Sequence, residues 1–219
     1  MTLAIRDAGK ALLQRCYSPR RFLWRLPAGH GAMALTFDDG PDPLHTPALL
    51  DLLAAHGVKA SFFVIGDKVS GQAALMRRIA AEGHAIGGHT WSHRDIVGRS
   101  RPELGADLQR CRLAIGAACG VDTALFRPPR GRVDLAAIHH VAMLGYCMVH
   151  WSKTYGDYRR DGAERLLARV RATPPGAGDI ALFHDHNEHT LAVLRALIPE
   201  WLAGGLGFAA IPGGAAAPR

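Results

Sequence analysis

Between residues 32 and 211 the sequence alternates short apolar runs with longer amphipathic segments, and turn residues separate the two. The apolar runs have the length of strands, and the segments between them have the length of helices, with Thr46-Pro47 opening the first and glycines closing several. The predicted strands span 32–37, 61–65, 84–88, 124–127, 146–151, 179–184 and 207–211. The predicted helices span 46–55, 72–81, 102–118, 134–144, 162–172 and 190–203. This alternation predicts an α/β fold with one parallel sheet and helical crossovers.

The strand pattern fits a closed or nearly closed barrel better than an open nucleotide-binding sheet. Neither GxGxxG nor GxxxxGK[ST] follows the first strand, where an open sheet that binds a nucleotide carries one of them. At 219 residues the chain has the length of one substantial domain. We therefore predict a single domain over residues 28–219, preceded by a basic helical extension over residues 1–27.

The formal net charge of +7 is carried mostly by arginine, and much of the excess lies in the N-terminal extension. Such an excess favours an acidic partner, such as a phosphate, a pyrophosphate or a membrane surface. The extension has a partly apolar helical face, which suits a helix packed on the domain and, as the less favoured alternative, a helix on a membrane surface. Nucleic acid is not an expected partner, because no binding motif and no interleaving of aromatic and basic residues is present.

The expected location is the cytoplasm, with the inner membrane face as the alternative. No apolar stretch has the length of a signal-peptide core or of a membrane span. The four cysteines form no CxxC pair and no metal-finger spacing, so we expect reduced thiols, which suit a reducing compartment.

Two adjacent carboxylates, Asp38 and Asp39, follow the first predicted strand and precede Gly40-Pro41. Neighbouring side chains of a strand point to opposite faces, but this alternation ends where the strand turns, so both carboxylates can face one cleft. Taken alone, the stretch is typical of a solvated turn. Two carboxylates this close raise each other's pKa unless a cation or an arginine offsets them, so a site here needs a metal, a partner base or both.

Other polar residues also lie past the carboxyl ends of predicted strands. They are His89, His93, Arg127, Asp157 and His184. Barrel folds build their active sites at this end of the strands. The segregation therefore favours a functional site over a solvated turn at Asp38–Asp39.

The spacing of His89 and His93 predicts a metal site. On a helical turn, two imidazoles four residues apart share a face and can converge on one ion. Together with a carboxylate from Asp39 they form a set of two nitrogens and one oxygen, which is typical of catalytic zinc and leaves positions open for water and substrate.

Hydrolysis at such a metal needs a base and an acid. Asp38 lies beside the expected ligand Asp39 and is the predicted base, and Arg127 can keep it ionised. His184 is the predicted acid for the leaving group, and a carboxylate such as Asp157 would raise its pKa and keep it protonated near neutral pH.

Five segments, in order along the chain, carry these residues. They are Thr36–Pro41, His89–His93, Phe126–Gly131, Trp151–Tyr158 and Leu182–His184. In this combination they resemble the five motifs of the polysaccharide deacetylases, also called the NodB homology group or carbohydrate esterase family 4. The resemblance implies a distorted (β/α)7 barrel that hydrolyses N-acetyl or O-acetyl groups on sugars with a divalent metal, usually zinc.

By the same likeness each residue has a role. Asp38 is the base, Asp39, His89 and His93 are the metal ligands, His184 is the acid, Arg127 pairs with Asp38, and Asp157 pairs with His184. The backbone N–H of Arg130 would help to stabilise the oxyanion.

Three positions depart from the usual pattern of this family. Arg130 stands where a tyrosine is usual, Tyr158 where a tryptophan is usual, and Thr154 where many members have an aspartate. The cation at Arg130 suggests an anionic neighbour such as a phosphate. His186 and His189 lie outside the motifs, and we expect exposed loop histidines there rather than a second metal site.

The predicted function is metal-dependent removal of acetyl groups from N-acetylated sugars in a chitooligosaccharide, peptidoglycan or another glycan that contains N-acetylglucosamine, with release of acetate. Zinc is the favoured metal, and Co²⁺, Ni²⁺ and Mn²⁺ suit the same ligands. The sequence does not distinguish N- from O-deacetylation and does not set the oligomeric state.

Two alternatives remain. The first keeps the site and changes the substrate: deacetylation or deformylation of a lipid-(pyro)phosphate-linked sugar at the inner membrane face, or amide hydrolysis of a small ureide. The second is an inactive carbohydrate-binding module on the same fold. It is disfavoured because the base, the three ligands and the acid are all present.

Overall fold

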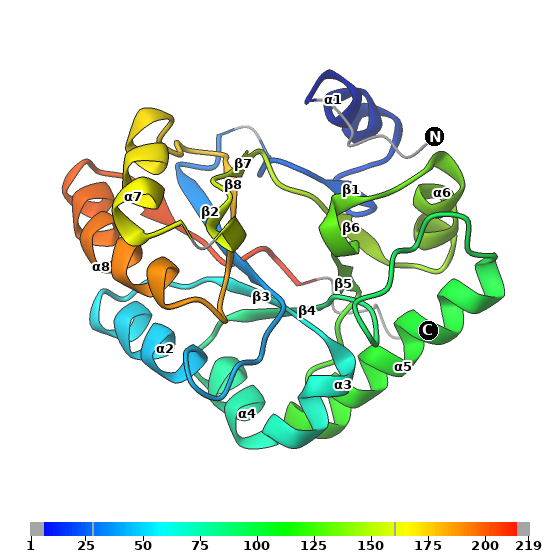
Figure 1. Cartoon of the computed structure of the whole chain (residues 1–219). Helices are drawn as coiled ribbons and strands as arrows, with labels where there is room; N and C mark the ends of the chain where they lie inside the picture. Colours follow the sequence, from blue (N-terminus) through cyan, green and yellow to red (C-terminus); the bar gives the residue numbers. More distant parts are fainter. Residues whose placement is uncertain (1–6, 28, 160, 214–219) are drawn as a thin grey trace.

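A computed structural model of the chain describes residues 7–27, 29–159 and 161–213, in which a curled sheet is surrounded by helices (Figure 1). The strands are β1 (Phe22–Leu23), β2 (Ala32–Asp38), β3 (Ser61–Val64), β4 (Ala85–Gly88), β5 (Leu125–Phe126), β6 (Cys147–Val149), β7 (Lys153–Thr154), β8 (Ile180–His184) and β9 (Gly207–Phe208). The helices are α1 (Asp7–Cys16), α2 (Thr46–Ala55), α3 (Gly66–Val69), α4 (Ala73–Ala81), α5 (Arg101–Cys119), α6 (Leu135–Met143), α7 (Ala163–Ala172) and α8 (Glu188–Ala203). Single 3₁₀ turns lie at Ser70–Gln72, Pro129–Gly131 and Asp157–Arg159.

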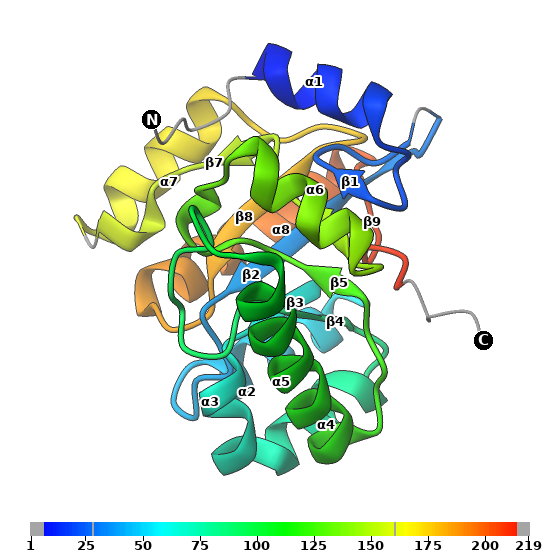
Figure 2. The same ribbon diagram turned by 90° about the vertical axis from the view of Figure 1, so that its right-hand side faces the viewer.

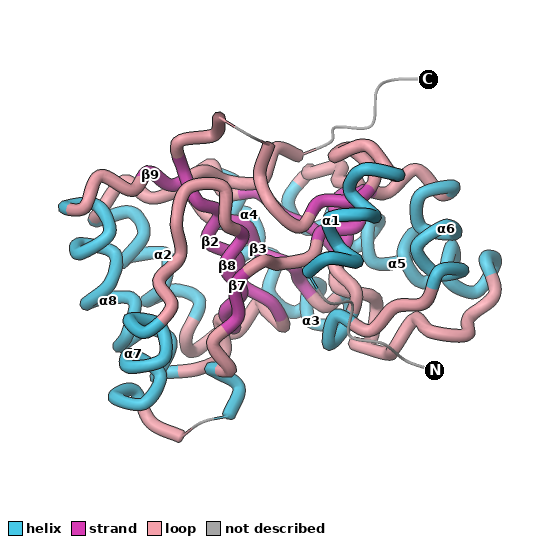
Figure 3. The backbone as a smooth tube through the Cα atoms, turned by 90° about the horizontal axis from the view of Figure 1, so that it is seen from above, coloured by secondary structure: helices cyan, strands magenta, loops and turns pink. Residues whose placement is uncertain are grey.

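The sheet is parallel throughout its named strands, which confirms the predicted class. Its order is β1-β6-β5-β4-β3-β2-β8-β7, and β9 pairs with β2 outside this path. The two ends of the path, β1 and β7, are not paired with each other, so the barrel is incomplete. Seen from above, the strands lie between α7 and α8 on one side and α5 and α6 on the other (Figure 3).

The central strand β2 brings the ends of the neighbouring strands together at one edge. All of its residues after Ala32 are buried, because β3 and β8 flank it and helices cover it. In the register of these strands Asp38 lies opposite Phe63 on β3 and His184 on β8. Since the strands are parallel, their carboxyl ends meet at the same edge of the sheet.

Local signals explain where several helices begin and end. Before α5, Ser100 and Glu103 form a reciprocal capping box, and Gly120 ends the helix with a φ of 74°. Asp134 caps α6 by accepting a hydrogen bond of 2.7 Å from the backbone N–H of Ala137. None of the helices in the described ranges is long and apolar enough to span a bilayer.

The structure does not show a separation of residues 7–27 from the rest of the chain at the predicted boundary between residues 27 and 28. The structure does contain a helix in the basic extension, α1, but Phe22 and Leu23 follow it as strand β1 and pair with β6. Phe22 is fully buried. The sheet therefore begins before residue 28, and α1 packs against β1.

Helix α1 lies along the outside of the sheet beside β1 (Figure 2), and a lysine secures it there. Lys10 is only 8% exposed. Its Nζ donates a hydrogen bond of 2.9 Å to the backbone carbonyl of Trp151 and lies 5.7 Å from the centre of the Trp151 ring. Trp151 follows β6, so this contact ties the extension to the segment between β6 and β7.

We expect Lys10→Met to lower the free energy of unfolding by about 1–3 kcal/mol, because a charged hydrogen bond is lost and the Trp151 carbonyl loses its partner. Urea unfolding followed by fluorescence would measure this change. The matched control is Arg15→Met, which removes an exposed charge from the same helix. Equal unfolding midpoints for the two variants would contradict the role of Lys10.

Candidate active site

The two adjacent carboxylates face one cleft, as their position at the end of a strand predicts. Asp38 is the last residue of β2, and Asp39 leaves the strand with a φ of 74°. This left-handed conformation breaks the alternation of the strand, so both side chains line a cleft of about 480 Å³. His89, His93 and His184 line the same cleft.

Asp38 pairs with Arg127, as expected. Nη1 of Arg127 donates hydrogen bonds to Asp38 Oδ1 (2.7 Å) and to Thr36 Oγ1 (2.8 Å). The guanidinium is fully buried, and it also donates to the backbone carbonyls of Val149 and His150, each at 3.3 Å. Burial lowers the pKa of Arg127, while the charge of Asp38 opposes that shift. The buried guanidinium therefore has the Asp38 carboxylate as its charge partner.

Asp39, His89 and His93 form a group that could hold a metal ion. One potential ligand atom from each lies within 4.8 Å of the others. Asp39 Oδ1 lies 3.4 Å from His89 Nε2 and 3.2 Å from His93 Nε2. No other group of three or more such residues was found in the described part of the chain.

The local chemistry fits a cation at this group. Asp39 Oδ1 is buried and has no hydrogen-bond partner among the described residues. His89 Nδ1 lies 2.8 Å from the backbone carbonyl of Arg127. A carbonyl only accepts, so Nδ1 carries the proton and Nε2 keeps a lone pair for a metal. Burial alone would raise the pKa of Asp39, but the neighbouring imidazoles of His89, His184 and His93 lower it.

The two histidines do not converge through a helical turn, so that part of the prediction is wrong. Residues 89–93 form an irregular loop, in which Thr90 has a φ of 62° and His93 a φ of 56°. The left-handed residues reverse the chain, and this reversal, rather than helical periodicity, brings both imidazoles to Asp39. The ring centres of His89 and His93 lie 5.1 Å apart.

His184 lies beside Asp157, as expected. His184 Nδ1 is 2.9 Å from Asp157 Oδ1. Asp157 Oδ2 accepts hydrogen bonds from the backbone N–H of His184 (2.7 Å) and from the hydroxyl of Thr190 (2.9 Å). Burial alone would lower the pKa of His184, but the hydrogen bond and charge of Asp157, with the charges of Asp38 and Asp39, raise it to about 9.

We expect Asp157→Asn to move the alkaline limit of activity to lower pH. With its pKa near 9, His184 can act as an acid until the pH rises through that value. The variant removes the hydrogen-bonded charge, so the pKa of His184 and the alkaline limb should fall by about 1–3 pH units. A pH profile of kcat/KM measures this shift. In the matched control, Thr190→Val, Asp157 keeps its charge, so the alkaline limb of the pH profile should stay in place. If the alkaline limb of Asp157→Asn does not move, Asp157 does not set the pKa of His184.

Arg130 lies at the rim of the cleft with a φ of 55°. Its Nη1 is 2.9 Å from Asp95 Oδ1, and Nη1 of Arg132 is 2.7 Å from Asp95 Oδ2. Arg130 therefore has an anionic neighbour within the chain, the carboxylate of Asp95.

The other cleft walls come from the fourth and fifth motifs. Trp151, Thr154, Tyr158 and Leu182 complete the lining. Tyr158 is 59% exposed and meets His184 edge-on, with 6.0 Å between the ring centres. An aromatic side chain thus lines the cleft beside the expected acid.

His186 and His189 are partly buried, not exposed as predicted. The ring of His186 lies 5.5 Å from that of His184. Neither residue belongs to a group of three or more potential metal ligands in the described ranges.

One supporting residue, Asp185, was missed by the sequence reasoning. It is 3% exposed, and its Oδ2 accepts a hydrogen bond of 2.6 Å from Thr46 Oγ1. Thr46, predicted as the cap of α2, lies inside the helix instead and also accepts from the backbone N–H of Asp42 (2.9 Å). A Cβ at Gly40 would lie 2.1 Å from Asp185 Oδ2. The turn after Asp39 therefore requires glycine and packs on a buried carboxyl.

Comparisons with known proteins identify relatives of this chain. The profile of the family described as polysaccharide deacetylase matches residues 25–149. A peptidoglycan-N-acetylglucosamine deacetylase of Bacillus cereus is 33% identical over 195 residues, which cover 86% of this chain and 91% of the relative. A chitooligosaccharide deacetylase of Bradyrhizobium sp. is 40% identical over 162 residues, 72% of each chain.

A solved structure agrees with these sequence matches. The Bc1960 peptidoglycan N-acetylglucosamine deacetylase, in complex with a hydroxamate-type benzamide ligand, superposes with a TM-score of 0.82 at 28% identity. The match covers 88% of this chain and 92% of that one. The predicted barrel class is confirmed by this likeness.

Proposed function

The chain belongs to the polysaccharide deacetylase family, carbohydrate esterase family 4, and on that premise we propose that it removes the N-acetyl group from N-acetylglucosamine units of a glycan and releases acetate. One observation carries the proposal. An Asp38–Arg127 pair and a His184–Asp157 pair flank a single Asp-His-His group, and Asp38 and His184 each approach it to 3.9 Å. A base, an acid and a cation site thus converge on one cleft.

The metal is proposed to be Zn²⁺. Asp39, His89 and His93 would hold it, and two nitrogens with one oxygen are a common catalytic zinc set. A bound divalent cation supplies Lewis acidity, which polarises the acetyl carbonyl and lowers the pKa of water. Co²⁺, Ni²⁺ and Mn²⁺ accept the same ligands, so metal analysis of protein purified without added metal identifies the native ion.

In the proposed reaction, Asp38 takes the proton of the attacking water while Arg127 stabilises the carboxylate before that transfer. The new C–O bond leaves a negative charge on the acetyl oxygen, and the backbone N–H of Arg130 donates a hydrogen bond to it. His184 then gives its Nε2 proton to the amide nitrogen. The C–N bond breaks, and the products are acetate and the free amino sugar.

The proposal is tested by acetate release from metal-loaded protein. The substrates are N-acetylchitohexaose, peptidoglycan glycan strands, a lipid-linked N-acetylated sugar and acetylated xylan. We expect acetate with the N-acetylglucosamine glycans. No release from any of the four would reject the deacetylase function for this chain, and release from xylan alone would reject the N-acetyl specificity.

Contact of the basic N-terminal segment with the inner membrane face is a separate proposal. It rests on the exposed Arg15 and Arg20 and on Leu12, which is 62% exposed on α1. Deleting the segment would remove β1 and the Lys10 contact, so charge reversal is the cleaner test. Wild-type protein should co-sediment with anionic vesicles and Arg15→Glu/Arg20→Glu should not; equal sedimentation would rule the contact out.

A further inference from the structure

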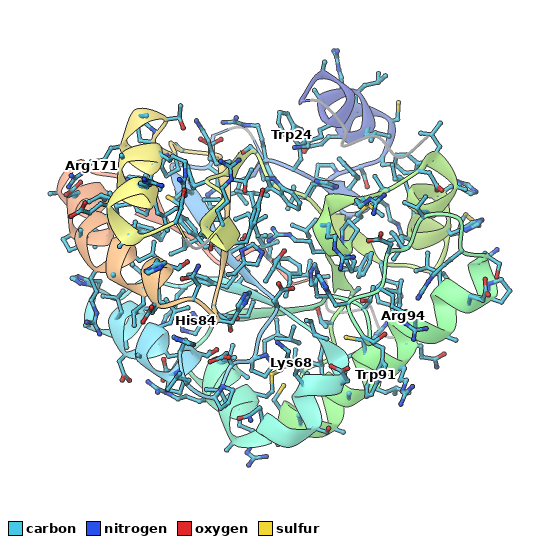
Figure 4. All side chains as sticks on the ribbon, viewed as in Figure 1. Trp24, Lys68, His84, Trp91, Arg94 and Arg171 are labelled. Atoms are coloured by element: carbon cyan, nitrogen blue, oxygen red, sulfur yellow. The ribbon has the colours of Figure 1, made fainter. Side chains whose placement is uncertain are left out.

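A second depression lies directly behind the loop that carries His93. It measures about 450 Å³ and is formed by residues after β4 and by the first turns of α5. We call it the arginine groove, and its polar lining is Trp91, Ser92, Arg94, Arg99, Asp107 and Arg110. Trp91 and Arg94 lie next to α5 (Figure 4). Since Arg94 directly follows His93, which lines the catalytic cleft, the groove and the cleft lie on two sides of one loop.

The arginines of the groove outnumber its carboxylates. Its single acidic residue, Asp107, is already engaged by Arg99 at 2.9 Å and by the backbone N–H of Trp91 at 2.7 Å. Arg94 and Arg110 are exposed, and neither forms an ion pair with a carboxylate in the described part of the chain. At the cleft rim, in contrast, Arg130 and Arg132 share Asp95.

Arg110 is held in a conformation that suits an oxyanion. Its guanidinium lies 3.8 Å from the centre of the Trp91 ring. The indole packs closely on Gly66, where a Cβ would lie 2.7 Å from its Cε3 atom. A guanidinium that stacks through its face keeps its in-plane N–H groups for hydrogen bonds, and these match the two oxygens of a carboxylate or phosphate.

The same stacking argues against a neutral sugar as the ligand. The ring face that a sugar would need on Trp91 is covered by Arg110. The groove instead offers a ligand the positive charge and the N–H donors of Arg94 and Arg110. A neutral chitooligosaccharide offers these donors only uncharged hydroxyl and carbonyl oxygens, whereas a glycan with acidic substituents offers a charged oxyanion, which binds a guanidinium more strongly.

Resting on the proposed function, we propose that the arginine groove binds an oxyanion substituent, a carboxylate or a phosphate, on a sugar unit adjacent to the one that is deacetylated. The groove thereby makes the protein selective for acidic glycans. Arg94 and Arg110 supply the bidentate donors, and Trp91 positions Arg110. Screening by salt should weaken the selectivity, because both guanidinium groups are exposed.

The test compares pairs of substrates that differ in charge alone. The first pair is soluble peptidoglycan glycan oligomers with free lactyl carboxylates and the same oligomers after reduction of the carboxyls to alcohols. The second pair is N-acetylchitohexaose and its 6-O-phosphorylated derivative, which distinguishes phosphate from carboxylate. Acetate release gives kcat/KM for each, and calorimetry gives binding independently of turnover.

We expect wild-type protein to prefer an acidic member over its neutral partner by about tenfold or more, mainly through KM. Arg94→Ala/Arg110→Ala should bring that ratio close to one. The control, Arg101→Ala/Arg195→Ala, removes two exposed charges outside the groove and should keep the wild-type ratio. A wild-type ratio near one in both pairs, or a ratio that survives loss of Arg94 and Arg110, would overturn the proposal.

Failure of the groove and failure of the proposed function give different results. If acetate is released from acidic and neutral substrates with equal kcat/KM, the deacetylase function is supported and the proposed role of the arginine groove is rejected. If binding is selective for acidic glycans and depends on Arg94 and Arg110, but no substrate releases acetate, the role of the groove is supported and the deacetylase function is rejected.

Discussion

Asp38→Asn is expected to lower kcat by about 10³-fold, within the range that a positioned general base contributes, while the protein still binds its divalent metal. Asparagine keeps an oxygen within reach of Arg127 Nη1, which now bonds Asp38 at 2.7 Å, but it cannot take a proton. The metal-binding group consists of other residues and stays complete. Acetate release and calorimetric metal titration measure the two effects separately.

The control for this variant is Asp67→Asn, which makes the same chemical change at an exposed position on α3 and should retain wild-type turnover. Thermal unfolding shows whether the loss of charge beside the buried Arg127 has disturbed the fold. Turnover of Asp38→Asn within tenfold of wild type, in folded and metal-loaded protein, would exclude Asp38 as the base.

His93→Ala is expected to weaken divalent-metal binding by at least about 100-fold and to abolish detectable turnover. Loss of a residue that merely supports a ligand costs 10–100-fold in metal affinity in other proteins, so loss of a ligand should cost no less. His93 Nε2 lies 3.2 Å from Asp39 Oδ1 in the group of three expected ligands. The substitution removes this imidazole and leaves Asp39 and His89. Competition with a chromogenic chelator gives the affinity.

Chelation of the wild-type protein provides the matching result without a mutation. Turnover should vanish on treatment with a chelator and return on addition of Zn²⁺. His139→Ala removes an exposed histidine of α6 and should change neither affinity nor turnover. Full activity after exhaustive chelation, with no metal detected, would contradict a metal-dependent mechanism.

Much of the barrel could be predicted because its signals are local. The apolar run before Asp38 and the Thr46-Pro47 pair give β2 and α2 almost to the residue. The predicted set Asp38, Asp39, His89, His93 and His184 does gather at one cleft, since parallel strands end at one edge. For these five residues, the residue type and the position just after a strand were sufficient to predict that they share one cleft.

The elements that were missed depend on partners far along the chain. Strands β1 and β7 have two residues each, too few for any pattern, and they exist because β6 and β8 pair with them. The contact of Lys10 with Trp151 spans 141 residues. The loop that carries His89 and His93 reverses direction at left-handed residues. The helical spacing therefore predicted correctly that the two imidazoles meet, but not the conformation that brings them together.

The left-handed residues also limit what evolution in the laboratory can change here. Within the described ranges, the non-glycine residues with positive φ are Asp39, Thr90, His93 and Arg130, and all lie at the cleft or in its loop. Such conformations cost of order 1 kcal/mol or more each in a side-chain-bearing residue. A library of variants selected for thermal stability alone should therefore accumulate glycine or asparagine at positions 90 and 130. A library selected for turnover should keep Asp39 and His93 unchanged.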